Sequence, residues 1–131
     1  MQAEASADID TLKIATEWCR QMAAVEPGGF ASILAPDAVA HGLSPDGRVL
    51  RGPEAMQDYF ATLGRLCRPT GCEVLESVVS GERATLRWVI RFQPGLGAFD
   101  TRHTHVDGMS MIVTRDQRIV EVWNTYGSVW I

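Results

Sequence analysis

The fold of this chain is decided by the stretch His105-Val-Asp-Gly-Met-Ser-Met-Ile-Val-Thr-Arg-Asp-Gln-Arg-Ile-Val-Glu-Val-Trp-Asn124. It is rich in β-branched and aromatic residues on both sides of Arg115-Asp116-Gln117, which is typical of two strands joined by a turn. Similar segments precede it, so the second half of the chain is predicted to form neighbouring antiparallel strands. The expected strands cover residues 73–80, 83–92, 101–113 and 118–127.

The first half of the chain has helical patterning. Apolar residues recur every three or four positions from Asp8 to Val25, which predicts one face of a helix. We expect a short second helical piece at Phe30, Ile33 and Leu34, a brief extended segment at 38–41, and a third helix from Pro53 to about 64–69. Helices followed by a run of strands predict an α+β fold, in which a curved sheet encloses a pocket on its concave side.

Composition excludes several classes of function. The chain has 131 residues and a formal net charge of −4, so we expect one domain that binds neither nucleic acid nor anionic membranes. Its polar N-terminus lacks a signal-peptide pattern, and no apolar run is long enough to span a bilayer. The three cysteines, Cys19, Cys67 and Cys72, lack zinc-site spacing. We therefore expect reduced thiols and a cytoplasmic location.

Three strings of sequence resemble the SnoaL-like proteins of the nuclear-transport-factor-2-like superfamily. They are Leu34-Ala-Pro-Asp-Ala-Val-Ala-His41, Gly52-Pro-Glu-Ala-Met-Gln-Asp-Tyr-Phe60 and the closing hairpin that ends at Asn124. The resemblance covers nearly the whole chain and implies a single domain over residues 1–131. It implies a cone-shaped α+β barrel, with a curved, mostly antiparallel sheet wrapped on about three N-terminal helices.

The resemblance also bears on function. Proteins of this superfamily have a deep, mostly apolar cavity, need no cofactor and often form homodimers through the outer face of the sheet. They include ketosteroid isomerases, polyketide cyclases, epoxide hydrolases, dehydratases and non-catalytic binding proteins, so the fold alone does not determine the activity.

Two activities of the superfamily lack their residues in this chain. When positions are counted from Asp37, the tyrosine and the carboxylate base of ketosteroid isomerases fall on Trp18 and Gly42. The Asp–Arg–Asp set of limonene-type epoxide hydrolases falls on Arg87, Val89 and Asn124, so both carboxylates are missing. We therefore expect neither activity by those mechanisms.

The strongest candidate for acid–base chemistry is one face of the strand at 101–113. Alternate residues of a strand share a face, with successive members about 7 Å apart. His103, His105, Asp107, Met109 and Met111 therefore share a face that changes from ionisable to apolar. The resemblance implies an acid–base pair in this part of the fold, which His105 and Asp107 would supply by moving a proton from carbon to oxygen.

Two other interpretations of this face stay open. The ionisable residues can be solvated rim residues next to the loop at 94–100. His103, His105 and Asp107 also have the spacing of a partial metal site, but a third ligand would have to come from another strand. The superfamily usually lacks metal, so we expect no metal site.

Further residues are predicted near the cavity. The resemblance places Asn124 facing inward, where its amide would hold a substrate carbonyl or bond to neighbouring backbone. His41 ends the first extended segment and is expected to be a satisfied core histidine, with a catalytic role as the alternative. The residues expected to line the pocket are Trp18, Tyr59, Phe60, Met109 and Met111.

The strand at 83–92 has two different faces, one carrying Arg87 and Arg91 and the other carrying Leu86, Trp88, Ile90 and Phe92. The superfamily register points Arg87 inward, toward a carboxylate such as Asp107 or an anionic ligand. A register shifted by one residue exchanges the two faces.

Two hypotheses follow from the sequence. The first is a cofactor-free enzyme that cyclises or isomerises a hydrophobic, polyketide-like carbonyl compound, with a dehydratase or an epoxide-opening enzyme as variants. The second is a non-catalytic, dimeric ligand-binding protein. A polar pair inside the pocket favours the enzyme, whereas an apolar cavity with His105 and Asp107 outside favours the binding protein.

Overall fold

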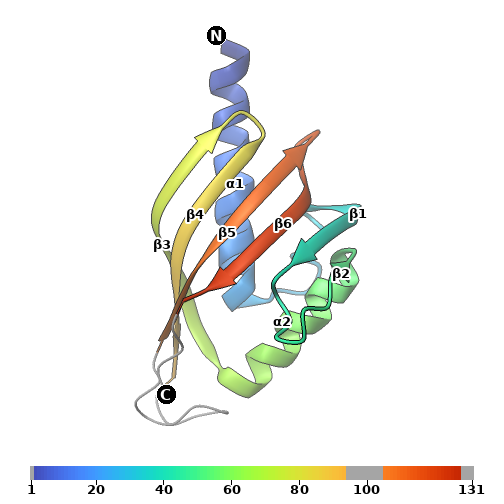
Figure 1. The fold of residues 1–131 in the computed structure, drawn as a ribbon, viewed down its shortest axis with the longest axis vertical. Coiled ribbons are helices and arrows are strands. Elements are labelled where there is room, and N and C mark those ends of the chain that lie inside the picture. The colour runs from blue at the N-terminus through green and yellow to red at the C-terminus, as the bar shows by residue number, and fades with distance from the viewer. Residues whose placement is uncertain (1, 94–104, 128–131) are drawn as a thin grey trace.

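Two helices and a six-stranded sheet make up the part of the protein that the computed structural model describes, residues 2–93 and 105–127 (Figure 1). The helices are α1 (Gln2–Ala24) and α2 (Pro53–Cys67). The strands are β1 (Leu34–His41), β2 (Leu50–Arg51), β3 (Pro69–Ser80), β4 (Arg83–Phe92), β5 (His105–Arg115) and β6 (Arg118–Tyr126).

The sheet is curved and unclosed, with the strand order β2-β1-β6-β5-β4-β3. Every neighbouring pair runs antiparallel except β1 and β6, which are parallel. Figure 1 shows α1 behind the sheet and α2 beside β2. The predicted α+β cone fold with a mostly antiparallel sheet is therefore confirmed.

The predicted second helical piece at Phe30–Leu34 is wrong. Residues 27–33 form consecutive turns instead, closed by isolated bonds such as Leu34 N–H to the Phe30 carbonyl at 2.9 Å. Leu34 already pairs with Ile119 of β6, and Pro36, which has no N–H to donate, prevents a helix from continuing. The described part therefore has two helices, not three.

The core lies between α1, α2 and the concave face of the sheet. Trp18 of α1 meets Phe30 and Phe60 edge-on, with ring centroids 5.4 and 5.8 Å apart. Leu86 and Trp88 of β4 are fully buried against this cluster. No helix in the described residues has the length and apolar content that crossing a membrane requires.

Burial alternates along β4 and β5 and identifies the two faces of the sheet. On β4, Leu86, Trp88 and Ile90 are buried, whereas the side chain of Arg87 is 43% exposed. Arg87 bonds Glu76 of β3 at 2.7 Å on the outer face. The inward orientation predicted for Arg87 is therefore wrong, and the alternative register is the one adopted, because the aromatic and aliphatic side chains bury more apolar surface.

Candidate functional site

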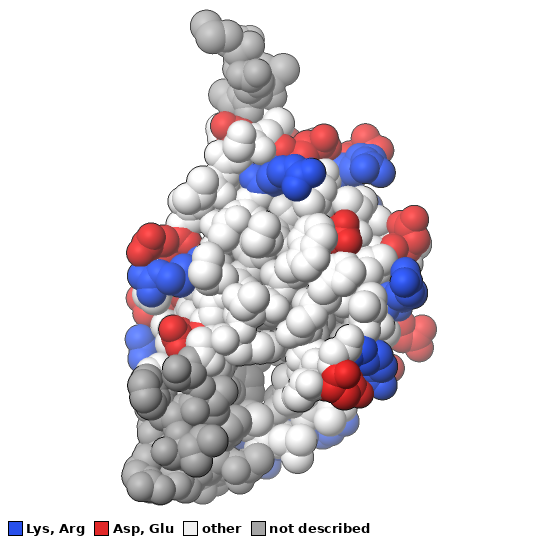
Figure 2. Space-filling view, in the orientation of Figure 1, with Lys and Arg blue, Asp and Glu red and all other residues white. Residues whose placement is uncertain are grey.

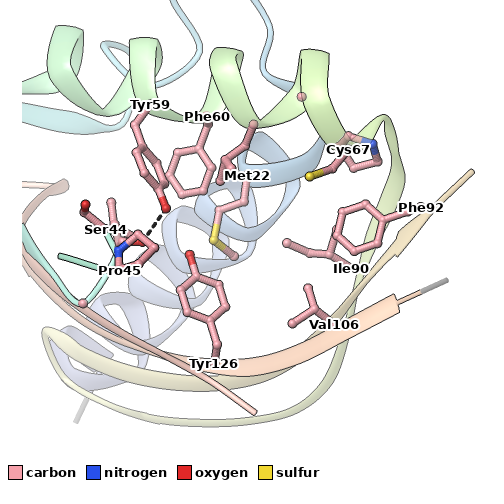
Figure 3. A pocket seen from close by; sticks show the side chains of 15 residues that line it. Met22, Ser44, Pro45, Tyr59, Phe60, Cys67, Ile90, Phe92, Val106 and Tyr126 are labelled. Atoms are coloured by element: carbon pink, nitrogen blue, oxygen red, sulfur yellow. Dashed lines mark hydrogen bonds between the residues drawn. The ribbon is translucent and has the colours of Figure 1, made fainter. Parts of the chain in front are cut away.

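An apolar cavity of about 320 Å³ lies between the C-terminal half of α2, the loop after β1 and the concave face of the sheet (Figure 3). Its wall is mainly hydrocarbon and aromatic, with Leu63 and Phe60 from α2 and Ile90, Phe92 and Val106 from β4 and β5. This volume falls within the range of about 300–1,000 Å³ found for small-molecule sites. The concave face of the sheet therefore offers a compartment for a compact hydrophobic molecule.

Two tyrosine hydroxyls give the cavity a polar end. Figure 3 shows Tyr59 reaching down from α2 and Tyr126 reaching up from β6 toward each other. Tyr59 donates its hydroxyl hydrogen to the carbonyl of Leu43. Part of the Tyr126 residue is exposed, but its hydroxyl lies in the cavity, where burial raises its pKa. Burial likewise raises the pKa of Tyr59.

Gly42 belongs to the cavity wall and approaches β6 closely. It has a φ of 75°, and a Cβ atom there would lie 2.1 Å from the carbonyl oxygen of Asn124. Only glycine fits this contact and this left-handed conformation. Within the described residues, the wall of the cavity contains no carboxylate and no imidazole.

A buried polar cluster centred on Ser110 and Asn124 lies next to the tyrosine end of the cavity. The Ser110 hydroxyl of β5 lies 2.9 Å from the indole nitrogen of Trp88, 3.2 Å from that of Trp18 and 2.6 Å from Asn124 Oδ1. The Asn124 amide nitrogen lies 3.4 Å from the sulfur of Met22, which lines the cavity. Asn124 is only 3% exposed, so the predicted inward orientation agrees with the structure.

The histidine–aspartate pair predicted for catalysis lies on the other side of the sheet. On β5 the even-numbered neighbours Val106, Gly108 and Ser110 are buried, whereas His105 and Met109 are exposed. Asp107 is half-buried against Gly127, outside the cavity wall. The predicted placement of this face in the cavity is wrong because a period of two puts it opposite the helices. His103 lies outside the described residues.

The remaining predicted residues divide between the two faces. Tyr59 and Phe60 line the cavity as predicted, whereas Trp18 lies in the core and does not reach the cavity wall. Met111 is 51% exposed on the outer face, like Met109, so neither methionine lines the pocket.

His41 also belongs to the outer face. Its Nε2 lies 2.7 Å from the carboxylate of Glu121, and its ring stacks on Trp123 with centroids 5.1 Å apart. It is satisfied, as predicted, but half-buried instead of buried in the core. Among residues 2–93 and 105–127, no group of three or more potential ligands is placed to hold a metal ion.

Two residues of the site were missed in the sequence. Tyr126 lies two positions after Asn124, so the same strand period that points Asn124 inward also points Tyr126 inward. Ser110 lies between Met109 and Met111 on the face that was assigned outward. The alternative register of β5 would have identified Ser110, whereas the period of β6 was sufficient to identify Tyr126.

Comparisons with known proteins agree with this architecture. A family model described as a SnoaL-like domain matches residues 15–122. A candidate polyketide cyclase from Sinorhizobium meliloti is 20% identical, with 86% of this chain and 94% of that chain covered and a TM-score of 0.67. A candidate SnoaL-like polyketide cyclase from Jannaschia sp. CCS1 is 14% identical, with 91% and 86% covered and a TM-score of 0.73.

A candidate ketosteroid isomerase from Kribbella flavida is 13% identical, with 95% of this chain and 82% of that chain covered and a TM-score of 0.72. At these identities the solved structures show a shared fold. No curated protein sequence gives a significant match.

Proposed function

Because the chain belongs to the SnoaL-like domain family, whose fold supports isomerisation and cyclisation without a cofactor, we propose that it isomerises or cyclises a compact hydrophobic carbonyl compound. One observation carries this proposal. It is the apolar cavity of about 320 Å³ with the hydroxyls of Tyr59 and Tyr126 at one end. The hydrocarbon wall favours an apolar ligand body, and the hydroxyls provide a place for one oxygen atom.

The chemistry of such a site follows from its low polarity. A carbonyl compound that passes a proton from its α-carbon to a water molecule entering the cavity develops negative charge on oxygen, and the same water can return a proton to complete the isomerisation. A hydrogen-bond donor in an apolar pocket stabilises the charge on oxygen more than water does. The ionisable side chains of the outer face do not line the cavity, so they make no contact with a ligand inside it. The proposed reaction therefore depends on the tyrosine end of the cavity.

A second candidate function is binding without catalysis. It is favoured by the criterion drawn from the sequence, because the cavity is apolar and His105 and Asp107 lie outside it. The described wall holds no carboxylate or histidine that would accept a proton from carbon. A ligand-binding protein needs only the shape and apolar character of the cavity. The two candidates therefore differ in proton transfer, and that difference is measurable.

The experiment uses 1-tetralone, a bicyclic ketone with exchangeable hydrogens beside its carbonyl. Binding is followed by calorimetry, and exchange of the α-hydrogens in D₂O is followed by proton NMR. Exchange faster than in buffer alone supports the enzyme, and binding without faster exchange supports the binding protein. Absence of binding would overturn both.

Two matched variants test whether the ligand binds in the cavity. Leu63→Trp fills space between α2 and the sheet and is expected to weaken binding at least tenfold, because Leu63 lines the cavity. Leu66→Trp, one turn further along the same helix, changes a residue that is 51% exposed and should bind normally. Equal effects of the two substitutions would show that the ligand binds elsewhere.

We also propose that the outer face of the sheet joins two copies of this chain. Three apolar side chains of this face are strongly exposed, Met109 at 41%, Met111 at 51% and Val78 at 72%, and the ion pair between Arg87 and Glu76 lies beside Met109. Because α1 lies behind the sheet, Figure 2 views this outer face and shows the charged side chains mainly around its margin. A second copy, turned by a two-fold axis, would cover the same apolar side chains on both chains.

A further inference from the structure

The direction of the buried hydrogen bonds around Ser110 is fixed by two tryptophans. An indole N–H can only donate, so Trp18 and Trp88 both donate to the Ser110 hydroxyl oxygen, at 3.2 and 2.9 Å. These bonds use both lone pairs of that oxygen. The single hydroxyl hydrogen of Ser110 must then go to its third neighbour, Asn124 Oδ1, at 2.6 Å.

This direction in turn fixes the amide of Asn124. Its oxygen faces Ser110, so its NH₂ group faces the opposite way, toward the sulfur of Met22 at 3.4 Å, on the face of β6 that also carries Tyr126. The reversed amide would place two donors against a hydroxyl that has no lone pair left to accept them. Asn124 is therefore held as a donor toward the cavity, where Met22 and Tyr126 both form part of the wall.

The two tyrosines of the cavity differ in how their hydrogens are used. Tyr59 donates its hydrogen to the backbone carbonyl of Leu43, so that hydrogen is committed within the protein. The Tyr126 hydroxyl points across the cavity toward Tyr59 (Figure 3), and Asn124 lies two residues earlier on the same face of β6. A ligand oxygen near the centre of the cavity can accept the hydrogen of Tyr126 without breaking a bond to the backbone.

From this geometry we propose that Tyr126 donates its hydroxyl hydrogen to an oxygen atom of the ligand, and that Ser110 and Asn124 are positioning residues that hold Tyr126 for this bond. The inference rests on the proposed function, since it names the ligand group that the same cavity selects. The ligand class is a hydrophobic molecule with a hydrogen-bond acceptor, such as a ketone or an aldehyde. Tyr126 is the residue that touches it, whereas Ser110 acts through Asn124.

The first test compares 1-tetralone with tetralin, which has the same two rings but no oxygen. Tyr126→Phe is expected to weaken the binding of 1-tetralone about tenfold, because it leaves the buried carbonyl of the ligand without a hydrogen-bond donor. The affinity for tetralin should change less than twofold. Tyr59→Phe should change the ratio of the two dissociation constants less than threefold, because the hydroxyl hydrogen of Tyr59 is already donated to Leu43.

The outcomes separate this inference from the proposed function. If both compounds bind and Tyr126→Phe weakens them equally, Tyr126 is not the donor and the inference fails, while the ligand-binding cavity stands. If neither compound binds to the unmodified protein, the proposed function fails. A loss that follows Tyr59→Phe instead would assign the donor to the other tyrosine.

The second test of the positioning residues measures the pKa of Tyr126. Structural damage that exposes the phenol to water would lower this pKa, whereas loss of a donor to the phenol oxygen would raise it. The chain has two tyrosines, so Tyr59→Phe leaves Tyr126 as the single phenol, whose ionisation is followed by ultraviolet absorbance. Adding Ser110→Ala frees the amide of Asn124 and should raise the pKa of Tyr126, and Ser110→Thr should restore it. Asn124→Leu, which removes the donor directly, should raise the pKa further.

An unchanged pKa in both Ser110→Ala and Asn124→Leu would overturn the positioning role. Circular dichroism establishes that each variant is folded before titration. If Ser110→Ala does not fold, Asn124→Leu decides the question, because it removes the same donor and leaves the Ser110 hydroxyl in place to accept from both tryptophans.

Discussion

The two faces of the sheet differ in composition and in chemistry, although they are built from the same strands. On the outer face lie Arg87, His105 and Asp107, the residue types on which enzymes most often rely. The inner face offers Ser110, Asn124 and tyrosine, among hydrocarbon. The inner groups matter because they are desolvated and fixed in direction, whereas exposed charges are screened by water. Environment, more than residue type, therefore identifies the candidate site.

The largest expected effect comes from a substitution in the core of the inner face. Leu86→Ala should lower the free energy of unfolding by about 3 kcal/mol, because Leu86 is fully buried and its loss leaves a cavity. Val78→Ala on the outer face, where the side chain is 72% exposed, should cost less than about 0.5 kcal/mol at protein concentrations low enough to keep the chain monomeric. Urea denaturation of both variants measures the difference. Equal losses would contradict the assignment of faces.

A smaller effect tests what the outer face does. Met111→Arg introduces a charge into the apolar centre of this face and should weaken self-association at least tenfold, because two arginines would meet across a two-fold axis. Analytical ultracentrifugation over a range of concentrations gives the dissociation constant. Met111→Leu is the control that keeps the surface apolar. A protein that is monomeric without substitution would refute the dimer proposal.

The smallest expected effect is a dependence of stability on pH that comes from the inner face. Burial raises the pKa of Tyr126 above its usual value of about 10. Above that pH the unfolded chain releases the tyrosine proton while the folded chain keeps it, so stability should fall as pH rises. The slope from this residue approaches but does not exceed about 1.4 kcal/mol per pH unit.

Tyr126→Phe should remove this contribution, and urea denaturation between pH 9 and pH 11 measures it against the unmodified chain. Because Tyr59 and the buried Cys19 also have raised pKa values, only the difference between the two proteins is assigned to Tyr126. Identical pH dependence in both proteins would show that the Tyr126 hydroxyl is as well solvated as in the unfolded chain.

The sequence predicted the elements better than it predicted their orientation. The patterns for α1, α2 and the four long strands are strong because each extends over several turns or alternations. The turns at 27–33 were mistaken for a helix because a few apolar residues at helical spacing do not reveal where the backbone bonds go. Strand β2 was missed because its two residues are too short for any pattern.

The choice of sheet face decided how much of the site was found. Both faces of β5 carry residues that fit a cavity wall, with His105 and Met109 on one side and Ser110 and Ile112 on the other. A shift of one residue exchanges them, and only packing against α1 settles which side is inward. The inward placement of Asn124, Tyr59 and Phe60 agrees with the prediction, because their positions do not depend on the register of β5.

The contact between Gly42 and the backbone of Asn124 restricts how this lineage can acquire new chemistry. Position 42 is where the superfamily pattern would place a carboxylate base, yet any side chain there collides with a carbonyl oxygen of β6 at 2.1 Å. Replacement of this glycine by aspartate is therefore expected to destabilise the fold before it provides a base. The route to steroid-type isomerisation requires a compensating movement of β6 first, so evolution or design would need at least two coordinated steps.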